Sequence, residues 1–190
     1  QMCIRDSVGG TGENSISMEA LVNNNDIVLL STGATKPRDL PIKNREGAGV
    51  YFAMEFLGQN TKSLLDHELK ENDYIDAKGK DVIVIGGGDT GNDCLGTSLR
   101  HGCKTLTNFE ILPELPSERM DNNPWPLFPR IYKVDYGHEE SREVFGKDPR
   151  EYSVSGKEFL RDKNGKLTGI KTVKVAVSYT HLRAHETNSN

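Results

Sequence analysis

The sequence predicts an α/β fold, and three observations in the middle of the chain support this prediction. First, residues 82–85 are four consecutive β-branched apolar residues, a pattern typical of a strand buried on both faces of a sheet. Second, a glycine cluster at 86–91 follows without a spacer, and the residues up to His101 are compatible with a helix that Gly102 would end. Third, a further strand fits residues 105–109. A strand, a tight turn, a helix and a second strand form the repeating unit of α/β folds.

The glycine cluster matches the spacing G-x-G-x-x-G at Gly86, Gly88 and Gly91. In this motif the first glycine makes the tight turn, the second lets the backbone approach a pyrophosphate, and the third lets the helix pack on the strand. Backbone N–H groups at the helix N-terminus would hold the phosphates, each bond contributing roughly 1.5–3 kcal/mol against about 0.3–1 kcal/mol from the helix dipole. The predicted phosphate-binding residues are those of the whole turn: Gly86, Gly87, Gly88, Asp89, Thr90 and Gly91.

An acidic residue, Glu110, follows the second strand and lies 19 positions beyond Gly91. A carboxylate at about 20 positions is expected to accept hydrogen bonds from the ribose hydroxyls of an adenosine. Because it would repel a 2′-phosphate, we expect NADH to be preferred over NADPH. A flexible Arg119 or Arg130 that reached the phosphate would weaken this preference. The alternative is a purely structural strand-to-helix turn, with Glu110 as an ordinary solvated carboxylate.

The N-terminal part of the chain predicts shorter and less regular elements. Ser17 begins a short amphipathic segment, 17–22, and is placed to cap it. Residues 26–35 predict a second buried strand ending in small residues, which permit close approach of a ligand or another backbone, although a plain exit from strand to loop is the alternative. Prolines and glycines predict a connector at 36–49. Apolar residues at helical spacing then occupy 52–57 and 64–69, with a break expected near Gly58.

The region after Glu110 predicts a long loop and then a hairpin. Five prolines between 113 and 129 surround Trp125 and Phe128, which rules out a regular element. We expect an ordered excursion pinned by its aromatic residues, and the alternative is a surface that faces a partner. Residues 157–162 and 167–175 predict two strands joined by a turn at Asn164 and Gly165.

Composition and charge exclude several classes of function. The hydrophobic content of 35% is low for a compact domain, and the charged content of 27% is close to average. With a formal net charge of −4 and no basic cluster, the chain is a poor candidate for binding nucleic acid or an anionic membrane. No apolar run approaches the length of about 18 residues that a membrane-spanning helix needs.

The cysteines and histidines do not predict a metal site. Cys94 and Cys103 are nine positions apart, which matches neither a zinc knuckle nor a C-x-x-C redox pair, so we expect structural thiols. His101 is expected to lie at the end of the helix beside the helix dipole, and not to act as a ligand or a catalyst.

The two ends of the chain mirror each other at the level of DNA. Residues 2–7 can be encoded by ATGTGTATAAGAGACAG, whose reverse complement contains GTC TCT TAT ACA CAT, a possible coding sequence for residues 177–181. This resembles a transposon-end adapter of sequencing libraries read through in both directions. We therefore expect residues 1–7 and 177–190 to derive from an adapter, and residues 8–176 to be a piece of a longer gene.

Five segments carry a family resemblance: Leu30–Arg38, Val84–Gly91, Asn108–Pro113, Asn123–Pro126 and Val134–Glu140. Together they resemble the small (β) subunit of glutamate synthase, or the equivalent C-terminal part of the fused NADH-dependent enzyme, over nearly all of residues 8–176. Glycine motifs are shared by many flavoproteins. The Trp-Pro loop followed by Asp-Tyr-Gly-His-Glu is much more particular to this family.

The resemblance implies a flavoprotein with two nucleotide sites. Residues 8–50 would be part of an FAD-binding domain and its connector, with Thr32, Gly33 and Ala34 against FAD. Residues 51–176 would be an inserted, truncated, Rossmann-like NAD(P)H-binding domain. An iron–sulfur cluster would be bound by a missing N-terminal part. Electrons would pass from NAD(P)H through FAD and iron–sulfur clusters to the large subunit, separate or fused, which makes glutamate from glutamine and 2-oxoglutarate. A cytoplasmic location is implied, and we expect no proton-transfer catalyst among these residues.

Two other functions fit parts of the sequence. A related NAD(P)H:ferredoxin-type or pyrimidine-reducing flavoprotein would share the two-domain core and differ in its electron acceptor. A non-catalytic dinucleotide sensor would need no FAD-binding part, and the segment Ser31–Arg38 argues against it. Thioredoxin reductase is disfavoured because this region has no C-x-x-C motif.

Overall fold

The computed structural model describes residues 15–30, 36–71 and 73–176, and the chain divides between Lys36 and Pro37 into two compact units. In the first unit, helix α1 spans Met18–Asn23, and the side-chain oxygen of Ser17 accepts a hydrogen bond from the N–H of Ala20. The predicted N-terminal cap is therefore confirmed.

The predicted buried strand at 26–35 is wrong over the part that the structure describes. Residues 26–30 adopt no strand, and Ile27, Leu29 and Leu30 are 87%, 86% and 58% exposed. A strand buried on both faces needs paired neighbours and covering helices. Among the described residues, none pairs with this segment as a strand. The residues expected to contact FAD, Thr32 to Ala34, lie outside the described residues.

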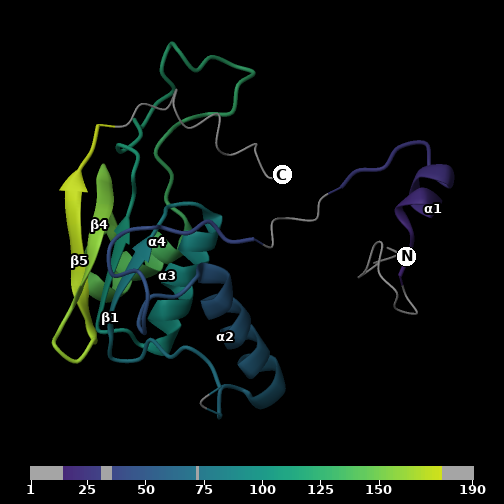
Figure 1. Cartoon of the computed structure of the whole chain (residues 1–190). Helices are drawn as coiled ribbons and strands as arrows, with labels where there is room; N and C mark the ends of the chain where they lie inside the picture. The colour runs from purple at the N-terminus through teal and green to yellow at the C-terminus, as the bar shows by residue number, and fades with distance from the viewer. Residues whose placement is uncertain (1–14, 31–35, 72, 177–190) are drawn as a thin grey trace. The chain divides into compact units, whose positions relative to one another are not determined.

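The second unit contains a three-stranded parallel sheet with the order β1-β2-β3 (Figure 1). Its strands are β1 (Asp81–Ile85), β2 (Thr105–Phe109) and the two-residue β3 (Arg150–Glu151). The register pairs each residue of β1 with one of β2, from Asp81 with Thr105 to Ile85 with Phe109. Both strands predicted in the central unit are confirmed, and β3 was not predicted.

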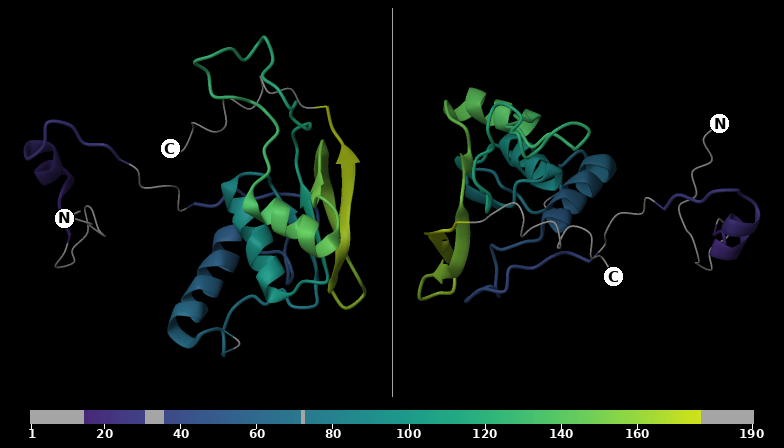
Figure 2. Two further views of the ribbon diagram at one scale, coloured as in Figure 1. Left: turned by 180° about the vertical axis from the view of Figure 1, so that it is seen from behind. Right: turned by 90° about the horizontal axis from the view of Figure 1, so that it is seen from above.

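Three helices lie side by side on one side of the sheet, and the middle one packs on the strands (Figures 1 and 2). They are α2 (Ala53–His67), α3 (Asp89–His101) and α4 (Tyr136–Phe145), with α3 between the other two. Helix α3 ends at Gly102 in the left-handed conformation, as predicted. Helix α4 was not predicted. The core beneath α3 comprises Ala77, Leu95, Cys103 and Leu106, with Phe56, Val82, Val84, Leu99 and Phe145 partly buried against it.

Two predictions about this core are wrong. Helix α2 continues through Gly58, because a glycine in a helix costs only about 1 kcal/mol and packing against α3 outweighs this cost. Strand β1 is buried on one face only: Val82 and Val84 contact the core, whereas Ile83 and Ile85 are 43% and 47% exposed. The helices cover the face that carries the two valines, which explains the alternation.

A β-hairpin follows the sheet and confirms the prediction made from the Asn-Gly turn (Figure 1). Strands β4 (Val154–Arg161) and β5 (Leu167–Lys174) pair antiparallel, and the Asp162 carboxylate accepts hydrogen bonds from the N–H groups of Asn164 and Lys166. The predicted connector lies along this hairpin, because Lys43 forms a parallel bridge with Glu158. No helix among residues 15–30, 36–71 and 73–176 has the length and apolar character needed to cross a membrane.

The proline-rich loop between β2 and α4 is held by a polar residue, not by its aromatic ones. Asn123 is 1% exposed, its Nδ2 donates to the carbonyl of Phe128 at 3.0 Å, and its Oδ1 accepts from the N–H of Arg130 at 2.7 Å. Trp125 and Phe128 are 83% and 75% exposed. Nζ of Lys133 lies 4.4 Å from the centre of the Phe128 ring, but neither ring is buried in the loop, so the predicted role of the aromatic residues as its anchors is wrong.

Candidate functional site

The glycine turn lies at the carboxyl end of β1, between β1 and the start of α3. Gly86 has φ +116°, a conformation that residues with side chains rarely adopt. Its N–H donates to the carbonyl of Phe109 at 2.9 Å, which ties the turn to the end of β2. The first glycine of the motif therefore makes the tight turn that the sequence predicted.

The third glycine of the motif, Gly91, brings α3 against the turn. A Cβ atom at Gly91 would lie 2.4 Å from the carbonyl oxygen of Gly86, well inside van der Waals contact. That oxygen also accepts a hydrogen bond at 2.9 Å from Nδ2 of Asn108, which donates to the carbonyl of Val84 at 3.1 Å as well. Asn108 is 1% exposed. The Gly86 carbonyl is thus held between the Asn108 amide and the backbone of Gly91.

Asn108 was not identified as a site residue from the sequence. A signal was present, since Asn108 alternates with Leu106 on the inward face of the predicted strand. A polar residue at an inward position requires a hydrogen-bond partner. The sequence could not show that this partner would be the glycine turn.

The N-terminus of α3 offers backbone donors to a ligand. Gly88 is the N-cap residue and the helix has no side-chain cap hydrogen bond. The first N–H groups of an α-helix have no partner within the helix, so an anion placed there would accept their hydrogen bonds. A Cβ atom at Gly88 would meet no atom within 4 Å. The space over the second glycine of the motif is therefore open to a ligand. Asp89 and Thr90, in the first turn, are both exposed.

Glu110 follows β2 directly and lies beside the glycine turn. Its backbone is fixed on both sides, since its N–H donates to the carbonyl of Glu151 and its carbonyl accepts from the N–H of Val154, both at 2.9 Å. Its carboxylate occupies the position that a side chain on Gly87 would take. Burial raises the pKa of Glu110, and the positive charge of Arg150 opposes this shift.

Arg150 is a further charged residue near Glu110 that the sequence did not single out. Its side chain is 6% exposed and forms a bidentate pair with Asp148, with Nε 2.9 Å from Oδ1 and Nη2 2.7 Å from Oδ2. Nη2 also donates to the Tyr132 hydroxyl at 2.6 Å, and Nη1 to the carbonyl of Lys133 at 2.8 Å. All three nitrogens of its guanidinium thus donate hydrogen bonds to protein groups near the carboxyl ends of the strands.

The two arginines considered as possible phosphate ligands lie in the proline-rich loop. Nη1 of Arg119 donates to the carbonyls of Asn123 and Leu127 at 3.0 and 2.8 Å. Nη2 of Arg130 donates to the carbonyl of Asn122 at 3.3 Å. Both guanidinium groups therefore contribute to the structure of the loop.

The remaining chemically notable side chains have structural roles. His101 is the last residue of α3; its Nδ1 accepts from the N–H of Ala77 at 3.2 Å and its Nε2 lies 2.7 Å from Oδ1 of Asn60. Cys94 and Cys103 are buried free thiols, and burial raises the pKa of Cys94 to about 11 and also raises that of Cys103. A thiol held protonated in this way is a poor nucleophile.

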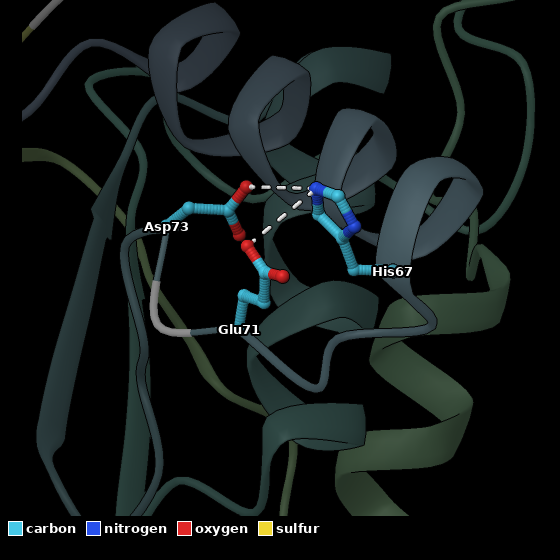
Figure 3. Close-up of side chains that lie close together, drawn as sticks. All are labelled: His67, Glu71 and Asp73. Atoms are coloured by element: carbon cyan, nitrogen blue, oxygen red, sulfur yellow. Dashed lines mark ion pairs between the residues drawn. The ribbon is translucent and has the colours of Figure 1, made fainter.

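A small group of ionisable side chains gathers at the C-terminal end of α2 (Figure 3). Nε2 of His67 lies 3.7 Å from a carboxylate oxygen of Glu71 and 4.0 Å from one of Asp73. The three side chains could approach one cation, but they are largely accessible to solvent and their separations are those of loose ion pairs. We assign no metal to them.

The fold and the glycine turn define a class of protein, a mixed α/β protein with a parallel sheet. At the carboxyl ends of its first two strands lie a glycine-rich turn, a helix N-terminus without a side-chain cap, and an acidic residue. The chain is homologous to glutamate synthases, which confirms the resemblance seen in its motifs. It is 57% identical over 168 residues to the glutamate synthase [NADH] of Schizosaccharomyces pombe and 53% identical over 161 residues to that of Saccharomyces cerevisiae. It is 47% identical over 160 residues to the glutamate synthase [NADPH] small chain of Bacillus subtilis.

These alignments cover most of this chain but a small part of each relative. They span 88%, 85% and 84% of this chain, and 8%, 8% and 32% of the three relatives in the same order. No family model matches the chain. The chain thus corresponds to one segment of a much longer protein in each case.

Proposed function

We propose that this chain is the pyridine-dinucleotide-binding segment of a glutamate synthase, and that the turn 86–91 and Glu110 bind NADH. The observation that carries the proposal is the geometry of the turn. Gly91 leaves no room for a side chain, Gly88 leaves open space over the helix N-terminus, and the Glu110 carboxylate lies against Gly87 in the same turn. This is the arrangement that a Rossmann-like fold uses for a dinucleotide.

Each part of the turn would hold a different part of the ligand. The free N–H groups in the first turn of α3 would donate hydrogen bonds to the pyrophosphate. The Glu110 carboxylate would accept hydrogen bonds from the adenosine ribose. Bound NADH supplies the hydride, and the protein residues bind and orient it. In this proposal no side chain of the described residues transfers a proton.

Three observations support NADH over NADPH. The Glu110 carboxylate would repel a 2′-phosphate in the same place. The guanidinium groups of Arg119 and Arg130 each donate hydrogen bonds to carbonyls of their own loop. The identity of this chain is also higher to the two yeast proteins named for NADH, at 57% and 53%, than to the Bacillus subtilis chain named for NADPH, at 47%.

The proposal extends to the whole protein of which this segment is a part. We place residues 8–50 in an FAD-binding domain, with Thr32, Gly33 and Ala34 against the flavin, and residues 51–176 in the inserted dinucleotide-binding domain. An iron–sulfur cluster is held by four cysteines, and the described residues contain two, Cys94 and Cys103, so the proposal assigns the clusters to another region of the full-length protein. That protein would work in the cytoplasm and deliver electrons to a large subunit that makes glutamate.

The experiment that tests NADH binding is isothermal titration of the 190-residue chain with NADH and with NADPH. We expect NADH to bind more tightly, and the substitution Glu110→Ala to raise its Kd by about tenfold or more, because a charge-assisted hydrogen bond contributes roughly 1.5–3 kcal/mol. A matched control is Glu143→Ala, which removes an exposed carboxylate on α4. Tighter binding of NADPH, or an equal effect of the two substitutions, would contradict the proposal.

A further inference from the structure

Gly87 is a glycine that its own backbone does not require. Gly86 needs its positive φ, and Gly91 needs room for the carbonyl of Gly86. Gly87 has no positive φ, so the backbone conformation there accepts an ordinary side chain. The reason for a glycine at this position must therefore lie in what surrounds it.

The space beside Gly87 is filled by the carboxylate of Glu110. A Cβ atom built on Gly87 would lie 1.4 Å from Oε1, 1.8 Å from Cδ and 2.0 Å from Oε2 of Glu110. All three atoms of the carboxyl group thus lie where the methyl group of an alanine would be. Gly88, the next residue, would meet no atom within 4 Å if it carried a Cβ. The close approach is specific to Gly87.

The backbone of Glu110 cannot move away easily, but its side chain can. Hydrogen bonds at 2.9 Å to Glu151 and from Val154 hold the backbone of Glu110 on both sides. The carboxylate is the far end of a flexible side chain. A methyl group on Gly87 would therefore displace the carboxylate and leave the turn intact.

We infer that Gly87 positions the Glu110 carboxylate on the turn and thereby determines the preference for NADH over NADPH. Gly87 acts through Glu110, so it is a positioning residue. This inference rests on the proposed function. When the carboxylate is displaced, the ribose hydroxyls of NADH lose their acceptor, and the 2′-phosphate of NADPH loses the charge that repels it.

The test compares two glycine-to-alanine substitutions in the same turn by isothermal titration with NADH and NADPH. Gly87→Ala is expected to raise the Kd for NADH by about tenfold and to leave the Kd for NADPH unchanged or lower, which reduces the discrimination. Gly88→Ala adds a methyl group where the pyrophosphate approaches, and both dinucleotides carry a pyrophosphate. We therefore expect Gly88→Ala to raise the Kd values of both dinucleotides by the same factor and to preserve the ratio of the two Kd values.

A third and a fourth variant show whether Gly87 acts through Glu110. Glu110→Ala alone should lower the discrimination, and adding Gly87→Ala to it should change the ratio of the two Kd values no further, since the carboxylate is already gone. If Gly87→Ala alone fails to fold, the double variant should fold, because the clashing group has been removed. A double variant that also fails to fold would overturn the inference.

The outcomes separate this inference from the function on which it rests. If the unaltered chain binds NADH and Gly87→Ala keeps the same ratio of Kd values, the positioning role is wrong and the dinucleotide site stands. If Gly87→Ala raises the Kd values of NADH and NADPH by the same factor, as is expected for Gly88→Ala, the positioning role is again wrong. If the unaltered chain binds neither dinucleotide, the proposed function and this inference are both wrong.

Discussion

The close contact between α3 and the glycine turn predicts that Gly91→Ala destabilises the protein, although alanine favours helices. The added Cβ would lie 2.4 Å from the carbonyl oxygen of Gly86 and 3.2 Å from its carbon. The oxygen cannot retreat freely, because Nδ2 of Asn108 holds it from the other side at 2.9 Å. Helix α3 must therefore move by about 1 Å to restore a normal contact, a shift of the size that accompanies overpacking.

The magnitude follows from two opposing terms. Overpacking costs about 1–3 kcal/mol, and replacing glycine by alanine within a helix returns up to about 1 kcal/mol. For a mid-range overpacking cost of about 2 kcal/mol, the net loss in free energy of unfolding is about 1–2 kcal/mol, which for a chain of this size lowers the melting temperature by roughly 2–8 °C.

Thermal unfolding followed by circular dichroism would measure this loss. Gly58→Ala is the matched control, because Gly58 lies within α2 and a Cβ there would meet no atom within 4 Å. Gly58→Ala should raise the melting temperature, because alanine has a higher helix propensity than glycine and its methyl group meets no other atom. A melting temperature for Gly91→Ala that equals or exceeds that of the unaltered chain would refute the close contact between α3 and the turn.

Three further predictions concern the residues that hold the site. Asn108→Leu should lower the free energy of unfolding, measured in urea, by about 1–3 kcal/mol, because two carbonyls lose their buried donor. An unchanged midpoint of urea unfolding would contradict the role of Asn108. Burial raises the pKa of Glu110, so the Glu110 carboxyl group holds its proton more tightly in the folded protein than in the unfolded chain. Ionisation of this group as the pH rises therefore lowers the free energy of unfolding. Glu110→Gln should therefore melt at a higher temperature than the unaltered chain at about pH 7, with the gap closing below about pH 4, and a gap independent of pH would count against this explanation. Burial by itself would raise the pKa of Asp148, but hydrogen bonds from Arg150 hold that pKa well below its usual range. The ionised Asp148 thus adds stability above about pH 4, and this stability is lost as the pH falls. Asp148→Asn should therefore lower the melting temperature at about pH 7 and lower it less in acid. An equal decrease in melting temperature at both pH values would contradict the ion pair.

The central β-α-β unit could be predicted from the sequence because its signals are local. The apolar run 82–85, the glycine spacing and the stop at Gly102 lie within a short stretch, and each has its own physical cause. The hairpin was predicted for the same reason, from the turn at Asn164 and Gly165. Local patterns of this kind do not depend on distant parts of the chain.

The elements that were missed depend on contacts between distant residues. Helix α4 begins beside a glycine, Gly137, whose N–H donates a hydrogen bond at 3.0 Å to Oδ1 of Asn92 on α3, a contact that is visible only in the structure. Strand β3 has two residues and exists because β2 pairs with it. Residues 26–30 have the composition of a strand but lack a paired neighbour among the described residues.

The same distinction holds for the site. The glycines and Glu110 could be identified from a spacing in the sequence. The roles of Asn108 and Arg150 could not, because each contacts groups that the fold brings together: two carbonyls near the turn for Asn108, and Asp148, Tyr132 and Lys133 for Arg150. The relation of Gly87 to Glu110 likewise appears only in three dimensions.

Binding of NADH at the glycine turn is tested most directly by an NMR titration of the isotope-labelled 190-residue chain, in which each backbone N–H group reports its own environment. We expect the N–H signals of residues 87–91 and of Glu110 to shift together, at one Kd, while those of the hairpin 154–174 stay in place. Saturable shifts confined to another region, or no saturable shift in the turn, would show that the glycine turn is structural and that the dinucleotide site lies elsewhere.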